Sequence, residues 1–173
     1  MAHHLATLPG HRDPDGARRA RNLRRVGIVA LLVFVATGLV GVLGPRTSDV
    51  AAEGGGYRLV AHHAQITRSG LATPFRIEVT RTGGFDAPVT LAFDKDLFDR
   101  LDFQNFYPNP AGETAAPHRI VYEFDPPGGE ILSVTLDART GPTQPPSAHW
   151  YWVAVLDDGR EAARVRFRMV VLP

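Results

Sequence analysis

The feature that most constrains this chain is a run of nineteen residues without a charge, from Val26 to Gly44. As an α-helix rising about 1.5 Å per residue, this run spans about 28 Å, close to the roughly 30 Å hydrocarbon core of a bilayer. A cleavable secretory signal has a shorter apolar region with small residues close behind it. Here the candidate cleavage point, Val50-Ala51-Ala52, lies well beyond the run. We therefore predict a retained transmembrane signal-anchor helix at residues 26–44, with cleavage as the alternative.

The charges around this segment predict its orientation. Six arginines precede it within residues 1–25, whereas Arg46 and Arg58 follow it. Because the cytoplasmic flanks of membrane helices are enriched in Lys and Arg, we expect the amino terminus in the cytoplasm and the remainder of the chain in an extracytoplasmic position. Residues 1–25 are predicted to be a disordered basic cytoplasmic tail, and residues 45–56 (PRTSDVAAEGGG) a flexible linker. The lipid bilayer is thus the first predicted partner, through residues 26–44.

The net charge of +1 conceals a division within the chain. Residues 1–25 hold six Arg and two Asp, a balance of +4, whereas residues 57–173 hold twelve Lys or Arg and fourteen Asp or Glu, a balance of −2. An acidic domain argues against nucleic acid as a partner. The chain has no cysteine. Disulfides and thiolate chemistry are therefore excluded, and stability requires a packed core.

Residues 57–173 show the sequence pattern of β-strands. In Phe75–Arg81 (FRIEVTR), hydrophobic residues alternate with polar or charged ones. Six other segments are rich in strand-forming residues: Tyr57–Ile66, Val89–Phe93, Arg119–Phe124, Ile131–Ala138, His149–Leu156 and Arg160–Leu172. Seven short strands with no long helical pattern between them predict an all-β domain, an antiparallel β-sandwich of two sheets.

Three stretches of this domain carry a family resemblance: FRIEVTRTGGFDAPVTLAF, FYPNP and YWVAVLDDGREAARVRFRMVV. Their succession of a strand, a Gly-Gly-Phe turn, a Pro-Val-Thr-Leu strand, a Pro-Asn-Pro and a final hairpin resembles the bacterial immunoglobulin-like modules of secreted and surface proteins. With its anchor, the chain also resembles small single-pass membrane proteins of high-GC bacteria whose role is not assigned. The resemblance implies an immunoglobulin-like β-sandwich for residues 57–173 and transfers no active-site residue. The chain departs from the module at an insert, residues 94–117, and at the Pro-rich loop 141–146.

The insert is rich in aspartate, which raises the question of a calcium site. A helix-loop-helix calcium loop needs Gly at its sixth position and Glu at its twelfth, where this insert has Asp99 and Asn105. We therefore predict a short helical turn capped by Asp94. The apolar residues at helical spacing in this turn are Leu97, Phe98 and Leu101.

The histidines and the motif content give no indication of a metal or of catalysis. His62 and His63 are adjacent on a predicted strand, so their side chains point to opposite faces, and His118 and His149 are isolated. No nucleophile elbow, phosphate-binding loop or dinucleotide fingerprint occurs, and no apolar cleft identifies a pair of catalytic carboxylates. We predict a protein that is not an enzyme and has no metal and no cofactor, with a hydrolase as a distant alternative.

The last hairpin, HWYWVAVLDDGREAARVRFRMVV, contains the candidate functional residues. Its final strand alternates hydrophobic residues with Arg164, Arg166 and Arg168. Trp150 and Trp152 lie two residues apart on the preceding strand and therefore share a face. Whether the indoles and the guanidiniums share one outer face depends on the turn between the two strands.

Two turns are compatible with this hairpin, and they give opposite results. A two-residue turn at Asp158-Gly159 pairs Trp152 with Val165 and sends both tryptophans into the core. A three-residue turn at 157–159 with a glycine bulge pairs Tyr151 with Val165 and leaves both tryptophans on the arginine face. The module resemblance, in which the equivalent Tyr faces inward, favours the second arrangement.

An outer face with two indoles and three guanidiniums predicts binding. Each stacked pair contributes about 0.5 to 2 kcal/mol, and such a surface suits a carboxylate-rich partner. We predict a non-catalytic interaction or accessory module that docks a membrane or cell-envelope protein, with binding of an envelope polysaccharide as the alternative. Two structural explanations compete with both functions. In one, the Trp and Arg side chains only shield the sheet and discourage edge pairing; in the other, the insert covers this face with its aromatic residues Phe98, Phe103, Phe106 and Tyr107.

Overall fold

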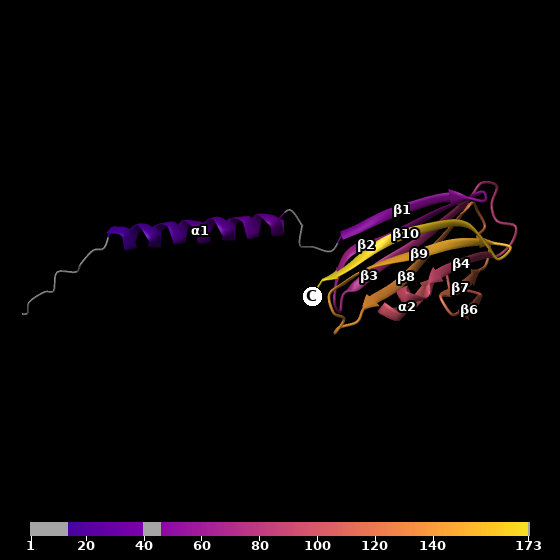
Figure 1. Cartoon of the computed structure of the whole chain (residues 1–173). Coiled ribbons are helices and arrows are strands. Elements are labelled where there is room, and N and C mark those ends of the chain that lie inside the picture. Colours follow the sequence, from indigo (N-terminus) through magenta and orange to yellow (C-terminus); the bar gives the residue numbers. More distant parts are fainter. Residues whose placement is uncertain (1–13, 40–45, 173) are drawn as a thin grey trace, which may run out of the picture. The chain divides into compact units, whose positions relative to one another are not determined.

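The computed structural model describes residues 14–39 and 46–172, which belong to two units divided between residues 43 and 44. The first unit contains helix α1 (Pro14–Leu39), drawn in indigo in Figure 1. Consecutive apolar side chains from Leu31 to Val35 are 47–66% exposed. Because successive residues are about 100° apart around a helix, these side chains surround it on all sides.

Two sequence predictions concern this first unit. The tail was expected to be disordered throughout, but residues 14–25 belong to α1, because Ala, Arg and Leu favour helix and proline is well tolerated at its first position. Residues 1–13 of the tail and residues 40–44 of the anchor lie outside the described residues. Within the described part of the chain, no helix combines the length and the apolar character needed to cross a membrane.

The second unit is a β-domain built on one ten-stranded sheet, with the short helix α2 (Lys95–Arg100) between its fourth and fifth strands. Hydrogen-bonded neighbours follow the order β5-β8-β3-β2-β10-β9-β4-β7-β6, and β1 pairs with β2 off this path. The strands in chain order are β1 (Arg46–Gly54), β2 (Tyr57–Arg68), β3 (Ala72–Arg81), β4 (Val89–Asp94), β5 (Leu101–Tyr107), β6 (Gly112–Ala116), β7 (Arg119–Phe124), β8 (Ile131–Thr140), β9 (Ser147–Asp157) and β10 (Arg160–Leu172).

Strand β2 joins the two parts of this sheet. Its first half pairs antiparallel with β3, whereas residues 66–68 pair in parallel with residues 170–172 of β10. The sheet is therefore mixed, and the prediction of a purely antiparallel arrangement is wrong at this pair. The sheet curls, as Figure 1 shows, and brings the inner face of β3 towards that of β10. The ring centroids of Phe75 and Phe167 are 5.4 Å apart across this interior.

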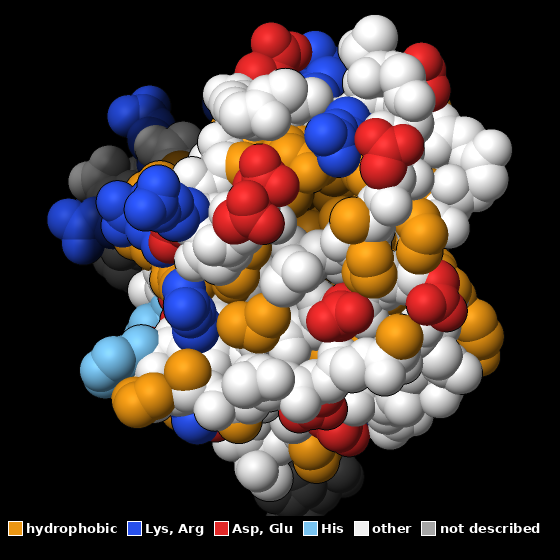
Figure 2. All heavy atoms as spheres, turned by 90° about the vertical axis from the view of Figure 1, so that its right-hand side faces the viewer, with side chains coloured by type: hydrophobic (Ala, Val, Ile, Leu, Met, Phe, Trp, Pro, Cys, Tyr) orange, Lys and Arg blue, Asp and Glu red, His pale blue; other side chains and the backbone are white. Residues whose placement is uncertain are grey.

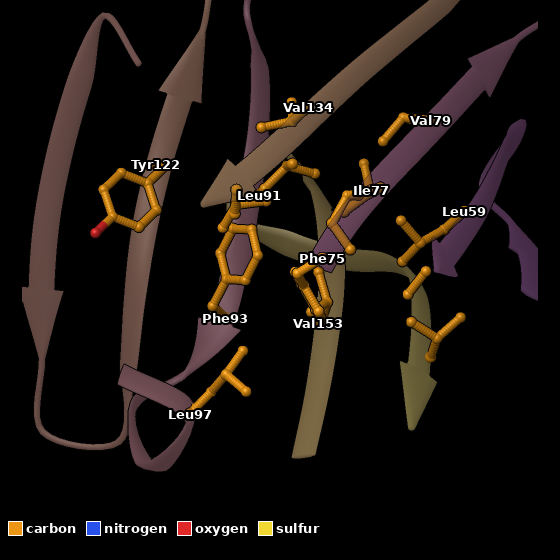
Figure 3. Packing of buried hydrophobic residues seen from close by; sticks show 14 of the residues in the cluster. Leu59, Phe75, Ile77, Val79, Leu91, Phe93, Leu97, Tyr122, Val134 and Val153 are labelled. Atoms are coloured by element: carbon orange, nitrogen blue, oxygen red, sulfur yellow. The ribbon is translucent and has the colours of Figure 1, made fainter. Parts of the chain in front are cut away.

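A hydrophobic core fills the interior of the curled sheet. Leu59 of β2, Ile77 of β3, Leu91 of β4 and Val153 of β9 are fully buried and lie around this interior in Figure 3. Along β3, buried residues alternate with outward-facing ones, as the two-residue period of a strand requires. Each fully buried side chain of this size contributes about 1.5–3 kcal/mol to folding, so the core stabilises a domain that has no disulfide.

The seven predicted strands are present, with ends shifted by a few residues, and β1, β5 and β6 were not predicted. Strand β1 occupies most of the segment that was predicted to be a flexible linker, and that prediction is wrong. Val50 and Ala52 pack, partly buried, against the core. On the opposite face, Glu53 Oε1 lies 2.7 Å from Arg58 Nη1 of β2. The segment escaped prediction because Ala, Asp and Gly have low strand propensity.

The predicted helical turn of the insert is confirmed as α2. Asp94 caps it, since the carboxylate accepts a hydrogen bond from the backbone N–H of Asp96 at 3.1 Å. Leu97 is fully buried. The remainder of the insert forms β5, which pairs with β8, and β6, which pairs with β7. The insert thus supplies both end strands of the sheet order, β5 and β6.

The insert aromatics do not cover the outer face of β9 and β10. Phe98 and Phe103 are in contact, with ring centroids 4.4 Å apart, and Phe106 lies 4.6 Å from the ring of Tyr122 of β7. Tyr122 belongs to the buried core. These phenylalanines therefore close the interior of the curled sheet, and Tyr107 is exposed. The explanation in which the insert shields the tryptophan face is wrong.

Candidate interaction surface

A two-residue turn connects β9 to β10. Asp158 and Gly159 adopt φ angles of 47° and 77°, and Asp157 pairs with Arg160. Positive φ at both central residues is typical of the tight turn that matches the twist of two antiparallel strands. The preferred prediction of a three-residue turn is therefore wrong.

A β-bulge just after this turn shifts the register by one residue. Leu156 pairs with Glu161, but Val155 pairs with Ala163, so Ala162 is the extra residue. Since side chains alternate between faces, one extra residue exchanges the faces of all residues beyond it. The short turn and the bulge together place the tryptophans on the outer face, which is the result that was expected from a three-residue turn.

As predicted, both tryptophans lie on the face of the arginines. Trp152 is opposite Arg166, and Trp150 is opposite Arg168. Tyr151, between the two tryptophans, is buried in the core. The pleat thus presents indoles and guanidiniums together on the outer side of β9 and β10. The five residues of this surface, the Trp/Arg face below, are Trp150, Trp152, Arg164, Arg166 and Arg168.

One end of the Trp/Arg face is filled by contacts within the protein. The guanidinium carbon of Arg164 lies 4.2 Å from the ring centroid of Trp152, a cation–π distance. The same guanidinium donates a hydrogen bond to the Glu161 carboxylate. Burial raises the pKa of the Asp94 carboxyl, and the nearby charge of Arg164 opposes that rise. The charge of Arg164 is therefore balanced locally, and the Trp152 ring is covered on one side.

The carboxylates near Arg164 were not predicted from the sequence. Glu161 and Arg164 are three residues apart, a spacing that places side chains on opposite faces of a regular strand. The bulge at Ala162 brings them to the same face. A bulge is set by tertiary packing, so the sequence holds no signal that would have predicted this pair.

The other end of the Trp/Arg face is open. Trp150 is 61% exposed, Arg168 is exposed directly opposite it, and Arg166 is exposed at the diagonal position, opposite Trp152. Within residues 14–39 and 46–172, neither of these two arginines has an ion-pair or hydrogen-bond partner. Guanidiniums bind carboxylates through charge-assisted hydrogen bonds, and an exposed indole contributes a large apolar contact. This arrangement can hold an acidic group and an apolar group at the same time.

The positive charge of this face is local, because the loops at the turn end of the hairpin are acidic. Asp157 and Asp158 lie at the β9–β10 turn, and Asp86 and Glu130 line one depression in the neighbouring loops. Figure 2 looks onto this end of the domain and shows acidic side chains spread over it. The positive charge of the Trp/Arg face is therefore bounded by negative charge at this end of the domain.

The two adjacent histidines face opposite sides of β2, as predicted. His62 points outward, with Nδ1 2.8 Å from Asp49 Oδ1 and Nε2 3.6 Å from Glu78 Oε2. His63 is 2% exposed, and its ring lies 4.6 Å from that of Phe167. Among the residues that the structure describes, no group of three or more His, Cys, Asp or Glu is arranged to hold a metal ion.

Two further ionisable groups of the interior are structural. Burial raises the pKa of Tyr122 and that of Tyr151 to about 12. Both phenols therefore stay protonated at neutral pH and behave as core aromatics. A depression of about 330 Å³ at β3, β5 and β8 is lined by Thr73, Asp137 and Arg139 among others, and neither phenol lines it.

Comparison of the chain with protein-family models, with curated proteins and with solved structures gave no match. Function is therefore argued from the surface itself, because a fold class alone does not identify an activity.

Proposed function

We propose that the protein is a non-catalytic interaction module, an immunoglobulin-like β-sandwich held on the outer side of the cell membrane by its amino-terminal helix. The Trp/Arg face docks a membrane or cell-envelope protein that presents carboxylates. The observation that carries this proposal is the open end of that face, where an exposed indole lies beside two exposed guanidiniums that have no partner within residues 14–39 and 46–172.

The order of the strands supports the immunoglobulin-like fold. Such domains order their strands A-B-E-D in one sheet and C-F-G in the other. In this chain β2-β3-β8-β5 and β4-β9-β10 are hydrogen-bonded in succession and stand in the same relative order along the chain as A, B, E, D and C, F, G, apart from the returning segment β6–β7. The parallel contact of β2 with β10 joins the two groups at their edges.

The composition of α1 supports the membrane anchor. Its described residues from Val26 onward carry no charge, and the apolar side chains surround the helix. A helix that is hydrophobic on all sides needs an apolar environment, and the arginines that precede Val26 are typical of a cytoplasmic flank. The uncharged run continues to Gly44 in the sequence.

Polysaccharide binding is the second candidate, and the exposure of Trp150 favours it, because sugar rings stack on exposed indoles. It ranks lower because the second indole, Trp152, is already covered by Arg164 at 4.2 Å. A hydrolase is a remote alternative, with no catalytic pair assigned in the described residues.

Photo-crosslinking in intact cells tests the docking function. A photoreactive residue replaces Trp150 in one variant and, as a matched control, the exposed Ile131 of β8 in another. We expect a discrete protein adduct from position 150, none from position 131, and loss of the adduct when Arg166 and Arg168 are both changed to Glu. Equal adducts at both positions, or an adduct indifferent to the double change, would contradict the proposal.

The location is tested separately from the docking. Protease added to cells whose outer layers have been opened, but whose cell membrane is intact, should degrade residues 46–172, and the protein should stay in the membrane fraction after alkaline extraction. Recovery of an intact domain in the soluble fraction would contradict the anchored arrangement.

A further inference from the structure

The two ends of the Trp/Arg face differ in how far their charges are already satisfied. At one end, Arg164 lies over Trp152 and is hydrogen-bonded to Glu161. The charge of this guanidinium is already partly balanced by Glu161, and one of its faces is covered by the indole, so an external carboxylate gains less from it than from an unpaired guanidinium. This end therefore supports the shape of the surface and offers little binding energy.

At the other end the groups are free to bind. Arg166 and Arg168 have no ion-pair or hydrogen-bond partner in the described ranges 14–39 and 46–172, and Trp150 is 61% exposed. Trp and Arg are the residues that most often dominate the energetics of protein interfaces. Because Arg166 and Arg168 are two residues apart on β10, their Cα atoms are about 6.5–7 Å apart.

This spacing matches one type of ligand. In an extended peptide, side chains of alternate residues point to the same side and repeat about every 6.5–7 Å. An acidic segment with Glu or Asp at alternate positions therefore presents one carboxylate to each guanidinium. Each carboxylate can accept two hydrogen bonds from one guanidinium.

We infer that Trp150, Arg166 and Arg168 bind an extended acidic segment of the partner protein, while Trp152 and Arg164 hold the face in shape. This inference rests on the proposed docking function and assigns its contact centre. Trp150 contributes apolar contact to the aliphatic stems of the acidic side chains, and the two arginines set the register of the segment.

A peptide fits this end better than an acidic sugar chain. Sugar chains bind strongly where several exposed rings form a platform, since each stacked ring contributes little by itself. Of the two indoles on the face, one is covered by Arg164, so a sugar chain has a single ring on which to stack. A peptide needs one apolar contact and two carboxylates, which the open end can accommodate.

Fluorescence of the full-length protein in detergent measures this binding directly, because the chain contains two tryptophans and both lie on the face. The Trp152→Phe background leaves Trp150 as the sole indole reporter. The probe is a short peptide of alternating Thr and Glu, titrated at low ionic strength, and the matched peptide with Gln in place of Glu is the neutral control. We expect a change in Trp150 emission with the acidic peptide and none with the neutral one.

Matched arginine variants decide which end binds. Arg166→Gln and Arg168→Gln should each weaken binding of the acidic peptide about threefold, and together about tenfold. Arg164→Gln removes the same charge from the other end of the face, acts only through the shape of the surface, and should weaken binding less than either of these variants. The assignment is overturned if Arg164→Gln weakens binding as much as Arg166→Gln, or if the neutral peptide binds equally well.

A third arm tests the nature of the ligand. Polygalacturonate carries carboxylates on sugar rings, and tighter binding of this polymer than of the acidic peptide would overturn the peptide assignment. Failure of this inference and failure of the docking function are distinguishable. A crosslink from position 150 in cells, combined with peptide binding that ignores Arg166 and Arg168, leaves the function standing and removes the assigned contact centre. Peptide binding as assigned, without a crosslink in cells, leaves the contact centre standing and removes the docking function.

Discussion

Gly54, at the end of β1, packs directly on the backbone of Ala162, so that a Cβ on residue 54 would overlap the Ala162 carbonyl oxygen. Ala162 is the bulge residue that places the tryptophans and the arginines on one face. The neighbouring Gly55, at φ 56°, would bring a Cβ to 2.8 Å from the Ala162 side chain. The β1–β2 hairpin therefore packs against the bulge, so a segment far away in the sequence contacts the residue on which the orientation of the Trp/Arg face depends.

Gly54→Ala should destabilise the domain and disturb this face together. Forcing a methyl group against backbone costs about 1–3 kcal/mol, and relief requires movement of the bulge. Urea unfolding measures the first effect, and tryptophan emission of the folded protein the second. Gly128→Ala is the matched control, because a Cβ there meets no atom within 4 Å, and we expect a change below about 0.5 kcal/mol. Equal stability of the two variants would disprove the packing role of Gly54.

The division of the Trp/Arg face into a closed and an open end predicts different effects on stability. Arg164→Gln removes a cation–π contact and an ion pair, and should lower the free energy of unfolding by about 0.5–1 kcal/mol. Arg166→Gln and Arg168→Gln remove exposed groups without partners in the described residues, and should change it by less than about 0.5 kcal/mol. Urea denaturation of the three single variants is the measurement. A larger loss for Arg166→Gln than for Arg164→Gln would contradict the division.

Much of the β-domain could be predicted from its sequence, because alternation in segments such as residues 75–81 follows directly from the period of a strand facing a core. The capped turn at Asp94 had an equally local signal. Strand β1 had no such local signal, since its inward residues Val50 and Ala52 lie among alanine, aspartate and glycine. It forms by pairing with β2. Local pattern suffices where burial is strong on one face, and fails where a neighbouring strand supplies the stability.

The orientation of the Trp/Arg face also could be predicted only in part from the sequence. The face shared by the tryptophans and the arginines was predicted, but from a three-residue turn, whereas the protein combines a two-residue turn with a bulge at Ala162. The turn follows from Asp158-Gly159 itself. The bulge packs against Gly54, which is remote in sequence, and the hairpin alone carries no signal for it.

His63 predicts a dependence of stability on pH. Burial lowers the pKa of its imidazole from the ordinary value of 6.5. The unfolded chain therefore takes up a proton near pH 6.5, while the folded chain takes it up only at lower pH. The stability that neutral His63 contributes is complete above pH 6.5 and is lost progressively as the pH falls towards the folded pKa.

The measurement is the difference in unfolding free energy between the wild type and His63→Gln, at pH 7.5 and again at pH 5. Other titrating groups, including Asp94, are common to both proteins and cancel in the difference. We expect the advantage of the wild type to shrink at the lower pH. A difference that is constant, or that grows on acidification, would show that His63 does not resist protonation in the core.

The assignment of β1 as a strand is tested by adjacent alanines. Ala52 packs, partly buried, against the core, whereas Ala51 is exposed on the other face of β1. A charge at position 52 must be brought against apolar side chains without a partner, so Ala52→Asp should cost about 1–3 kcal/mol. Ala51→Asp places the same charge in solvent and should change stability by less than about 0.5 kcal/mol. If residues 46–54 were a flexible linker, both variants would unfold at the same urea concentration as the wild type, so the contrast between these neighbours decides whether the domain begins at Arg46 or at Tyr57.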